Sequence, residues 1–257
     1  MKKKFGQNFL RNDSIINKII TIAEIDENST VYEIGPGDGA LTKEIINKNP
    51  KKFLAVEIDL SLKEQLSKLL VKKQHNILFV DALKFDEPSH FTSDTIVIGN
   101  LPYNISLKLL IKWIYQYPKK PWFKKMILMF QKEVAERIIS DENSKKYGRI
   151  TLITSSLFRV SKILDVCKND FFPVPKVDSA LLLFEPLQKP HLNLKNIKKL
   201  EFLSNNLFSS RRKKLKNKIE SLYDAETIEK NNLKNYFDLR AENLDRDTFF
   251  SLVKLLK

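Results

Sequence analysis

The feature that most constrains the fold is a regular alternation of short apolar runs with polar segments over the first half of the chain. The apolar runs are "TVYEIG" (30–35), "KFLAVEID" (52–59), "NILFVDA" (76–82), "DTIVIGN" (94–100) and "KMILMFQ" (125–131). Near-continuous apolar runs of this length suit strands that are buried on both faces of a parallel sheet. The segments between them, such as "GALTKEIINKN", favour helices, so the alternation predicts a doubly wound α/β sheet.

The pattern changes after residue 150. Two further strands are predicted, "VSKILDVC" (160–167) and "KVDSALLLFEP" (176–186), joined by the proline-rich "NDFFPVPK". Because no helix separates them, we expect an antiparallel pair at the sheet edge. From about residue 190 the apolar residues recur at three- and four-residue spacing, which indicates helices only. The sequence thus predicts an α/β domain over 1–188 and a small helical domain over 189–257.

The chain is strongly basic, with a net charge of +14 and a pI near 9.6. Such a charge favours a polyanionic partner, because neutralising phosphates releases counterions. A Lys-rich composition set by an AT-rich genome is the alternative. Residues 191–257 hold 15 Lys/Arg against 9 Asp/Glu, a net +6, whereas residues 1–190 hold 30 against 22, a net +8.

The tail is therefore the more basic part of the chain, and the run "RRKKLK" within it supplies candidate RNA contacts: Arg211, Arg212, Lys213, Lys214 and Lys216. A solvated helix face is the alternative for any such run. A second cluster, Lys145, Lys146 and Arg149, is open to either interpretation.

Two features bear on the cellular compartment. The single cysteine, Cys167, has no partner for an internal disulfide, which favours a reducing, cytoplasmic setting. No run of eighteen apolar residues predicts a membrane span, and the start "MKKKFGQNFL" lacks the apolar core of a secretory signal.

A glycine-rich turn follows the first predicted strand. In "EIGPGDGALT", Gly35, Gly37 and Gly39 allow a sharp turn and a close approach of a ligand to the backbone, although a plain tight turn has the same pattern. Glu57 lies 22 residues beyond Gly35, near the spacing at which an acid meets ribose hydroxyls; a solvated strand end is its alternative. The two features together favour a cofactor that contains a nucleoside.

Two more strand ends fall at the same predicted edge. Asp81, in "VDAL", is placed to accept from an adenine amine, or to cap a helix. In "NLPY", the Asn100 side-chain oxygen and the Leu101 carbonyl can accept the two hydrogens of an adenine amine, and Tyr103 can stack on the base. Pro102 forces the turn between them, because it keeps Leu101 out of the helical region. The alternative is an ordinary loop with a packed tyrosine.

No metal site is predicted. His75, His90 and His191 are scattered and lack the spacing of metal ligands.

At this point the sequence resembles a known family. "FGQNFL", "EIGPGDGALT", "VEID", "DAL", "GNLPYNIS", "YGRIT", "FFPVPKVDSA" and "SSRRKKLKN" occur in the order and approximate spacing of the ribosomal RNA adenine dimethyltransferases, from residue 5 to about 220. "NLPYNIS" and the basic helical tail are most similar to the branch that acts on small-subunit (16S) rRNA. The sequence departs from the family pattern at two positions. Asp38 stands where the family usually has an apolar residue, and Val174 stands where it usually has proline.

The resemblance implies a Rossmann-like class I methyltransferase with a mostly parallel seven-stranded sheet, an antiparallel edge strand and a small C-terminal helical domain. It also implies that S-adenosylmethionine is the cofactor. By the same similarity, Asn8, Leu10, Gly35, Glu57, Asp81 and Asn100 border that cofactor. Phe171 would clamp a flipped-out base against Tyr103, although core packing near an edge loop is also a fair reading of "FFP".

The function expected from this resemblance is transfer of methyl groups to the exocyclic amines of two adjacent adenosines in a hairpin near the 3′ end of small-subunit rRNA. The immature 30S subunit would be the partner, and a monomer is expected. The alternatives are a methyltransferase for large-subunit rRNA and an assembly factor that acts mainly by binding. A nicotinamide-dependent dehydrogenase is disfavoured, because it has no need of "NLPY".

Overall fold

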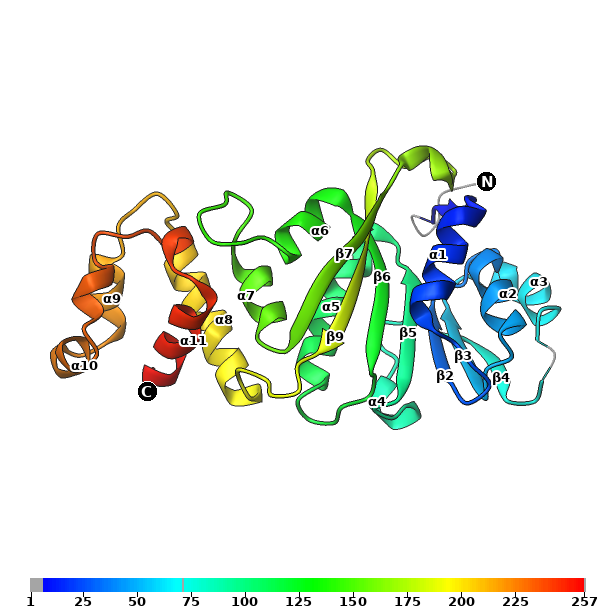
Figure 1. The fold of residues 1–257 in the computed structure, drawn as a ribbon, viewed down its shortest axis with the longest axis horizontal. Helices are drawn as coiled ribbons and strands as arrows, with labels where there is room; N and C mark the ends of the chain where they lie inside the picture. The colour runs from blue at the N-terminus through cyan, green and yellow to red at the C-terminus, as the bar shows by residue number, and fades with distance from the viewer. Residues whose placement is uncertain (1–6, 71, 257) are drawn as a thin grey trace. The chain divides into compact units, whose positions relative to one another are not determined.

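The computed structural model describes residues 7–70 and 72–256. Its strands are β1 (Phe9–Leu10), β2 (Thr30–Ile34), β3 (Lys52–Glu57), β4 (His75–Phe79), β5 (Thr95–Asn100), β6 (Lys125–Gln131), β7 (Phe158–Val166), β8 (Phe171–Phe172) and β9 (Ser179–Pro186). Its α-helices are α1 (Asp13–Ala23), α2 (Ala40–Asn47), α3 (Lys63–Ser67), α4 (Glu87–His90), α5 (Tyr103–Gln116), α6 (Lys132–Ile138), α7 (Arg149–Ser155), α8 (Leu194–Phe208), α9 (Lys216–Leu222), α10 (Ala225–Lys230) and α11 (Arg246–Leu255). Figure 1 shows their arrangement.

The predicted α/β sheet is confirmed. Seven strands pair in the order β4-β3-β2-β5-β6-β9-β7, and the neighbouring pairs from β4 through β6 are parallel. β9 runs antiparallel to β6, from Met126 opposite Phe184 to Gln131 opposite Ser179. The change of direction follows from the missing helix between β7 and β9, as the sequence indicated. Among the described residues, no helix is long and apolar enough to cross a membrane.

Both faces of the sheet are covered, which explains the near-continuous apolar runs. On one face, Phe53 and Ile96 belong to a core that also contains the apolar stripes of α1 and α2. On the other face, Tyr32 packs against Trp122, and Trp122 packs against Trp113 of α5. Successive strand residues therefore enter different cores, and a polar residue at either position would lie in an apolar layer.

A small second sheet connects the start of the chain to the proline-rich loop. β1 pairs antiparallel with β8, so that Phe9 lies opposite Phe172 and Leu10 lies opposite Phe171. Asp170, just before β8, accepts a hydrogen bond from the side chain of Asn12 at 2.8 Å. Two-residue strands have no periodicity, so no pattern of residues predicted this pairing.

The chain divides into two compact units: residues 1–135 with 161–185, and residues 136–160 with 186–257. Residues 136–160 thus group with the tail; the expected boundary between residues 188 and 189 stays a prediction. In this second unit Phe208 stacks on Phe249 with ring centroids 5.7 Å apart, and Tyr147 contacts both rings edge-on.

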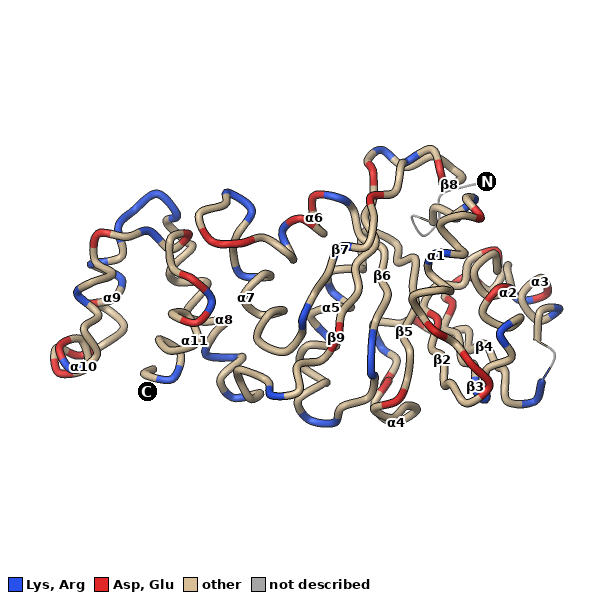
Figure 2. The backbone as a smooth tube through the Cα atoms, viewed as in Figure 1, with Lys and Arg blue, Asp and Glu red and all other residues tan. Residues whose placement is uncertain are grey.

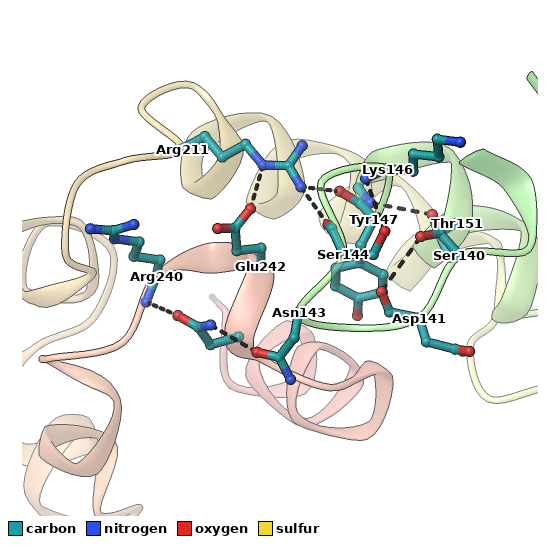
Figure 3. A network of polar contacts seen from close by, with 12 residues as sticks. Ser140, Asp141, Asn143, Ser144, Lys146, Tyr147, Thr151, Arg211, Arg240 and Glu242 are labelled. Atoms are coloured by element: carbon teal, nitrogen blue, oxygen red, sulfur yellow. Dashed lines mark hydrogen bonds and ion pairs between the residues drawn. The ribbon is translucent and has the colours of Figure 1, made fainter. Parts of the chain in front are cut away.

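Arg211 ties the two segments of the second unit together through polar contacts (Figure 3). Its guanidinium donates to the carbonyl oxygens of Ser144 and Tyr147, at 2.8 and 3.0 Å, and pairs with the Glu242 carboxylate at 2.6 Å. The backbone carbonyl of Glu242 in turn accepts from Asn143 at 2.7 Å. A single arginine thus provides hydrogen bonds to two loop carbonyls that are not paired within a helix or strand.

We predict that Arg211→Met lowers the free energy of unfolding of the second unit by about 2 kcal/mol, because charged hydrogen bonds contribute roughly 1.5–3 kcal/mol. The exposed neighbour Arg212 offers a matched control, and Arg212→Met is expected to change stability by less than about 0.5 kcal/mol. Both tryptophans, Trp113 and Trp122, lie in the first unit, so fluorescence reports that unit while circular dichroism follows the helices of both. Equal urea transitions for the two variants would contradict this role of Arg211.

Candidate active site

A cavity of about 320 Å³ opens at the carboxyl ends of β2, β3, β4 and β5. The sheet order places it where the chain changes direction between β2 and β5, the position at which open α/β sheets bind ligands. Its volume is near the lower end of the range for small-molecule sites, about 300–1,000 Å³. It is lined by Gln7–Leu10, Glu33–Asp38, Ala40, Leu41, Val56–Ile58, Val80–Leu83 and Asn100–Ile105.

The glycine-rich turn forms one wall of the cavity. Gly35, Gly37 and Gly39 have φ values of +67°, +58° and +87°, which L side chains rarely adopt. A Cβ atom on Gly37 would lie 2.8 Å from two ring carbons of Phe9. Glycine is therefore required here both for the backbone conformation and for the close approach of the N-terminal segment. The alternative of a plain tight turn does not explain why a cavity borders these residues.

The N-terminal segment closes a second side. Asn8, Phe9 and Leu10 line the cavity, as the resemblance implied for Asn8 and Leu10. The Asn100 side chain donates from Nδ2 to the Asn8 carbonyl at 2.8 Å. Only the amide nitrogen can donate to a carbonyl, so this bond fixes which way the Asn100 amide points. The Oδ1 atom of Asn100 is then the atom of this side chain that can accept a hydrogen bond from a ligand.

Glu57 lies at the end of β3 and is almost fully buried, with 4% of its surface exposed. Its Oε1 accepts from the backbone of Ile58 and Asp59 at 2.8 and 2.9 Å, and its Oε2 accepts from Gly37 at 3.1 Å. A carboxylate offers about four acceptor sites, so one site on Oε2 is left for a ligand hydroxyl. Glu57 therefore holds the glycine turn in place as well as facing the cavity, and it is not the solvated strand end of the alternative.

Asp81 follows β4 and lines the cavity beside Val80 and Ala82. Its Oδ1 accepts from the Leu83 backbone at 2.9 Å, so both alternatives from the sequence hold in part: the side chain closes a turn and also faces the cavity.

The residues of "NLPY" meet at the opposite end of the cavity, where β5 ends and α5 begins. The Pro102 carbonyl accepts from Ile105 and Ser106, both at 3.1 Å, and so starts the helix. The Tyr103 hydroxyl lies 2.6 Å from the Ser179 hydroxyl at the start of β9. Partial burial raises the pKa of Tyr103, with a further contribution from the Asp178 charge, so its side chain stays a neutral phenol.

Asp38, the departure from the family pattern in the glycine turn, is paired. Its carboxylate lies 2.5 Å from the Arg11 guanidinium, and its carbonyl accepts from Gln65 at 2.7 Å. The added negative charge is therefore balanced by a residue of the chain itself.

Glu33 is an acidic residue of the cavity that the sequence reasoning did not single out. It lies in β2, is 1% exposed, and accepts from the Thr42 hydroxyl at 2.7 Å. Burial raises the pKa of Glu33 to about 8, against the lowering effect of the Thr42 hydrogen bond, and the nearby Glu57 charge adds to the rise. An acid inside an otherwise apolar strand was the available signal, because a buried carboxyl needs a partner or a proton.

Phe171 is not brought to the cavity. It is 2% exposed and belongs to the hydrophobic core with Leu10, which agrees with the core-packing alternative; the base clamp stays a prediction. The adjacent Phe172 is 56% exposed. Phe172 lies opposite Phe9, which lines the cavity, and Phe171 lies opposite Leu10, which lines it too.

The candidate RNA-binding residues lie in the second unit and differ in their availability. Arg211 is engaged in the contacts described above, and Lys214 lies 2.6 Å from Asp238. Arg212, Lys213 and Lys216 are exposed. Figure 2 shows this run of Lys and Arg along the connection between α8 and α9.

The histidines do not form a cluster. His75 is buried with its Nε2 3.1 Å from the Pro50 carbonyl, while His90 and His191 are exposed. Among residues 7–70 and 72–256, no group of three or more His, Cys, Asp or Glu side chains could hold a metal ion.

A mostly parallel sheet with antiparallel pairing toward one edge, a glycine turn and acids on two successive strand ends define a Rossmann-like methyltransferase. The chain belongs to the ribosomal RNA adenine dimethylase family, whose model matches residues 1–257. The predicted enzyme class, an S-adenosylmethionine-dependent rRNA adenine dimethyltransferase, is thereby confirmed, and so is the predicted cofactor.

Known proteins agree with this assignment. The chain is 43% identical over 258 residues to the ribosomal RNA small subunit methyltransferase A of Pelagibacter ubique (strain HTCC1062), covering 98% of this chain and 95% of that protein. A dimethyladenosine transferase from Plasmodium falciparum is similar in structure, with a TM-score of 0.79 and 27% identity over 96% of this chain and 99% of the other. The 23S rRNA methyltransferase ErmE shares the fold, with a TM-score of 0.71 and 24% identity over 97% and 99%.

We predict that Glu33→Gln changes how stability depends on pH. The unfolded carboxyl ionises near its ordinary pKa of 4.5 and the folded one near 8, so the folded state binds more protons between these values. The contribution of Glu33 to the free energy of unfolding is therefore fully present below about pH 4.5 and is lost as the pH rises through 8. The total loss is roughly 1.4 kcal/mol for each unit by which the folded and unfolded pKa values differ.

The variant should match the wild type near pH 5 and exceed its stability by a few kcal/mol near pH 9. Urea unfolding of the cofactor-free protein, followed by tryptophan fluorescence, measures the difference. Parallel curves for the two proteins from pH 5 to 9 would show that Glu33 ionises normally.

Proposed function

We propose that this protein transfers methyl groups from S-adenosylmethionine to the exocyclic amines of adenosines in small-subunit rRNA. The target would be two adjacent adenosines in a hairpin near the 3′ end, modified during assembly of the 30S subunit. The observation that carries the substrate is the 43% identity, over nearly the full length of both chains, to a small subunit methyltransferase. The fold alone does not separate the two rRNA subunits, since ErmE has it as well.

The residues of the cavity fit the proposed cofactor. Gly35 leaves the backbone open beside the methionine portion, Glu57 has one acceptor site for a ribose hydroxyl, and Asp81 has a free Oδ2 for the adenine amine. Asn8 and Leu10 cover the site from the N-terminal side. Bound S-adenosylmethionine supplies a methyl group on a positively charged sulfur, which is a good leaving group.

Asn100 and Leu101 have the main part in the proposed mechanism. The bond from Asn100 Nδ2 to Asn8 leaves Oδ1 to accept one hydrogen of the target amine, and the Leu101 carbonyl accepts the other. Accepting both hydrogens keeps electron density on the nitrogen and favours its tetrahedral form, in which it can attack a methyl carbon. The bond from that carbon to sulfur would break with its electrons going to sulfur, and the methylated nitrogen would then lose one proton to water. These acceptors are positioned before the substrate arrives, and such positioning provides most of the catalysis that methyl transfer requires.

The target base has to leave its stack to reach these acceptors. Tyr103, held at its hydroxyl by Ser179, offers one face for the base. We assign the second aromatic surface for RNA to Phe172, because its side chain is exposed and lies next to the cavity-lining strand β1, while Phe171 is buried. The exposed cations Arg212, Lys213 and Lys216 are the candidate phosphate contacts.

Three further expectations stay predictions: a functional boundary between 188 and 189, a monomeric state and a cytoplasmic location. The single cysteine, Cys167, is exposed, and no step of the proposed reaction uses it.

The substrate is tested with labelled S-adenosylmethionine and three acceptors: under-methylated small subunits, large subunits and naked rRNA. We expect dimethyladenosine, identified by mass spectrometry, from the small subunits alone. Asn100→Ala should lower the rate by at least about a hundredfold, the scale of losing one positioned polar group. Label in the large-subunit RNA would move the protein to the other branch of the family.

The same variant separates the enzyme from an assembly factor. If Asn100→Ala abolishes methylation in cells and the small subunits still mature normally, the binding role is the more important one. If maturation slows together with methylation, the chemistry itself is required.

The aromatic assignment is tested with Phe172→Leu and its matched partner Phe171→Leu. Loss of a stacked ring contributes roughly 1–3 kcal/mol, so Phe172→Leu should lower kcat/KM for subunits about tenfold or more without changing stability. Phe171→Leu should lower the melting temperature with a smaller effect on kcat/KM, because the residue is in the core. The reverse pattern would restore Phe171 as the clamping residue.

A further inference from the structure

Lys112 lies on the buried side of α5 and contacts the loop that follows β4. Its ammonium donates to the Ala82 carbonyl at 2.8 Å and also to the Phe85 carbonyl. It pairs with the Glu87 carboxylate, at 2.9 Å from Oε1 and 2.8 Å from Oε2. Lys112 is thus a charged centre that holds three points of one short segment.

The partner of Lys112 is fully buried. Glu87 has no exposed surface, and its Oε1 also accepts from the Trp113 indole nitrogen at 2.8 Å. A buried carboxylate needs a matching charge and hydrogen bonds, and removing one partner leaves the other uncompensated. Each charge of the pair is therefore held in place by a further group: Lys112 by the carbonyls of Ala82 and Phe85, and Glu87 by the indole of Trp113.

The segment held by Lys112 is the one that presents Asp81 to the cavity. The Asp81 carbonyl accepts from Lys84 and Phe85 at 2.9 and 3.1 Å, and its side chain accepts from Leu83. The backbone carbonyls of Ala82 and Phe85 are left for another donor, and Lys112 supplies it. An apolar side chain at position 112 would leave the two carbonyls without this donor and the Glu87 carboxylate with its Trp113 hydrogen bond but no counter-charge.

We propose that the Lys112–Glu87 pair positions Asp81 for recognition of the adenine of the cofactor, so that Lys112 is a positioning residue for cofactor selectivity. The proposal rests on the proposed contact between Asp81 and the adenine amine. It links two parts of the site through α5, since this helix begins at Tyr103 and carries Lys112 nine residues later, about 13 Å along its axis.

The chemistry of the contact suggests a direct test. A carboxylate oxygen accepts from the amine of adenine, but it meets the carbonyl oxygen of hypoxanthine with an unfavourable contact. We therefore compare the dissociation constants of S-adenosylhomocysteine and S-inosylhomocysteine by calorimetry on the full chain. The wild type is expected to prefer the adenosyl compound by a factor of about a hundred, near the upper end of the roughly 1–3 kcal/mol cost of leaving a buried polar group unsatisfied.

Lys112→Met should reduce this preference to less than about tenfold, mainly by weakening the adenosyl compound. The KM for S-adenosylmethionine should rise by a similar factor, and kcat at saturating cofactor should change by less than that. A merely structural lysine would not alter the ratio of the two ligands.

Lys125→Met is the matched control. Lys125 is also a poorly exposed lysine that donates to a backbone carbonyl, Ile22, and pairs with a carboxylate, Glu24. Neither of these partners lines the cavity, whereas Ala82, a partner of Lys112, does. The Lys125→Met variant should lose comparable stability and keep the full preference. Asp81→Asn is the positive control and should lose the preference, because its amide can donate to hypoxanthine.

The outcomes are distinguishable. An unchanged ratio in Lys112→Met, together with a lost preference in Asp81→Asn, would overturn the positioning role and leave the role of Asp81 intact. An unchanged ratio in Asp81→Asn would overturn the adenine contact itself. If Lys112→Met does not fold, Glu87→Asp keeps both charges but shortens the carboxylate, and it should lower the preference at least threefold; an unchanged ratio there would also overturn the proposal.

Discussion

The close contact between Phe9 and Gly37 is the constraint on which the rest of the site depends. A Cβ atom on Gly37 would lie 2.8 Å from the Phe9 ring, so the N-terminal segment reaches the glycine turn only because this position has no side chain. Within that segment, the Asn8 carbonyl accepts a hydrogen bond from the Asn100 side chain, and Phe9 and Leu10 pair with β8. Three parts of the chain that are remote in sequence are thus joined at one wall of the cavity.

The distribution of charge separates the two ligands that the enzyme has to bind. The chain as a whole carries +14, which suits a polyanionic RNA, whereas the cavity is lined by four acids, Glu33, Asp38, Glu57 and Asp81. Acidic walls favour a cationic cofactor and disfavour phosphate. Asp38 is paired with Arg11, Glu57 is committed mainly to backbone amides, and burial favours the protonated form of Glu33. Asp81 therefore keeps the most acceptor capacity for a ligand.

The helix α5 relates the two halves of the cavity. Its first residue, Tyr103, belongs to the turn that we propose receives the target base, and Lys112 on the same helix holds the loop that carries Asp81. A helix has a regular rise per residue, so α5 sets the spacing between these two positions. In our proposal, one element therefore carries a residue for the target base and the residue that positions Asp81.

The sequence by itself determined the α/β fold, the strand order along the chain and the family. Periodicity is a local property, and "EIGPGDGALT", "VEID" and "NLPY" mark strand ends that a parallel sheet brings to one edge. Only the tertiary structure decided that β1 pairs with β8, that Phe172 rather than Phe171 is exposed, and that Arg211 is occupied by Ser144, Tyr147 and Glu242. These outcomes depend on partners far away in the chain, and no local pattern of residues records which partner a side chain will meet.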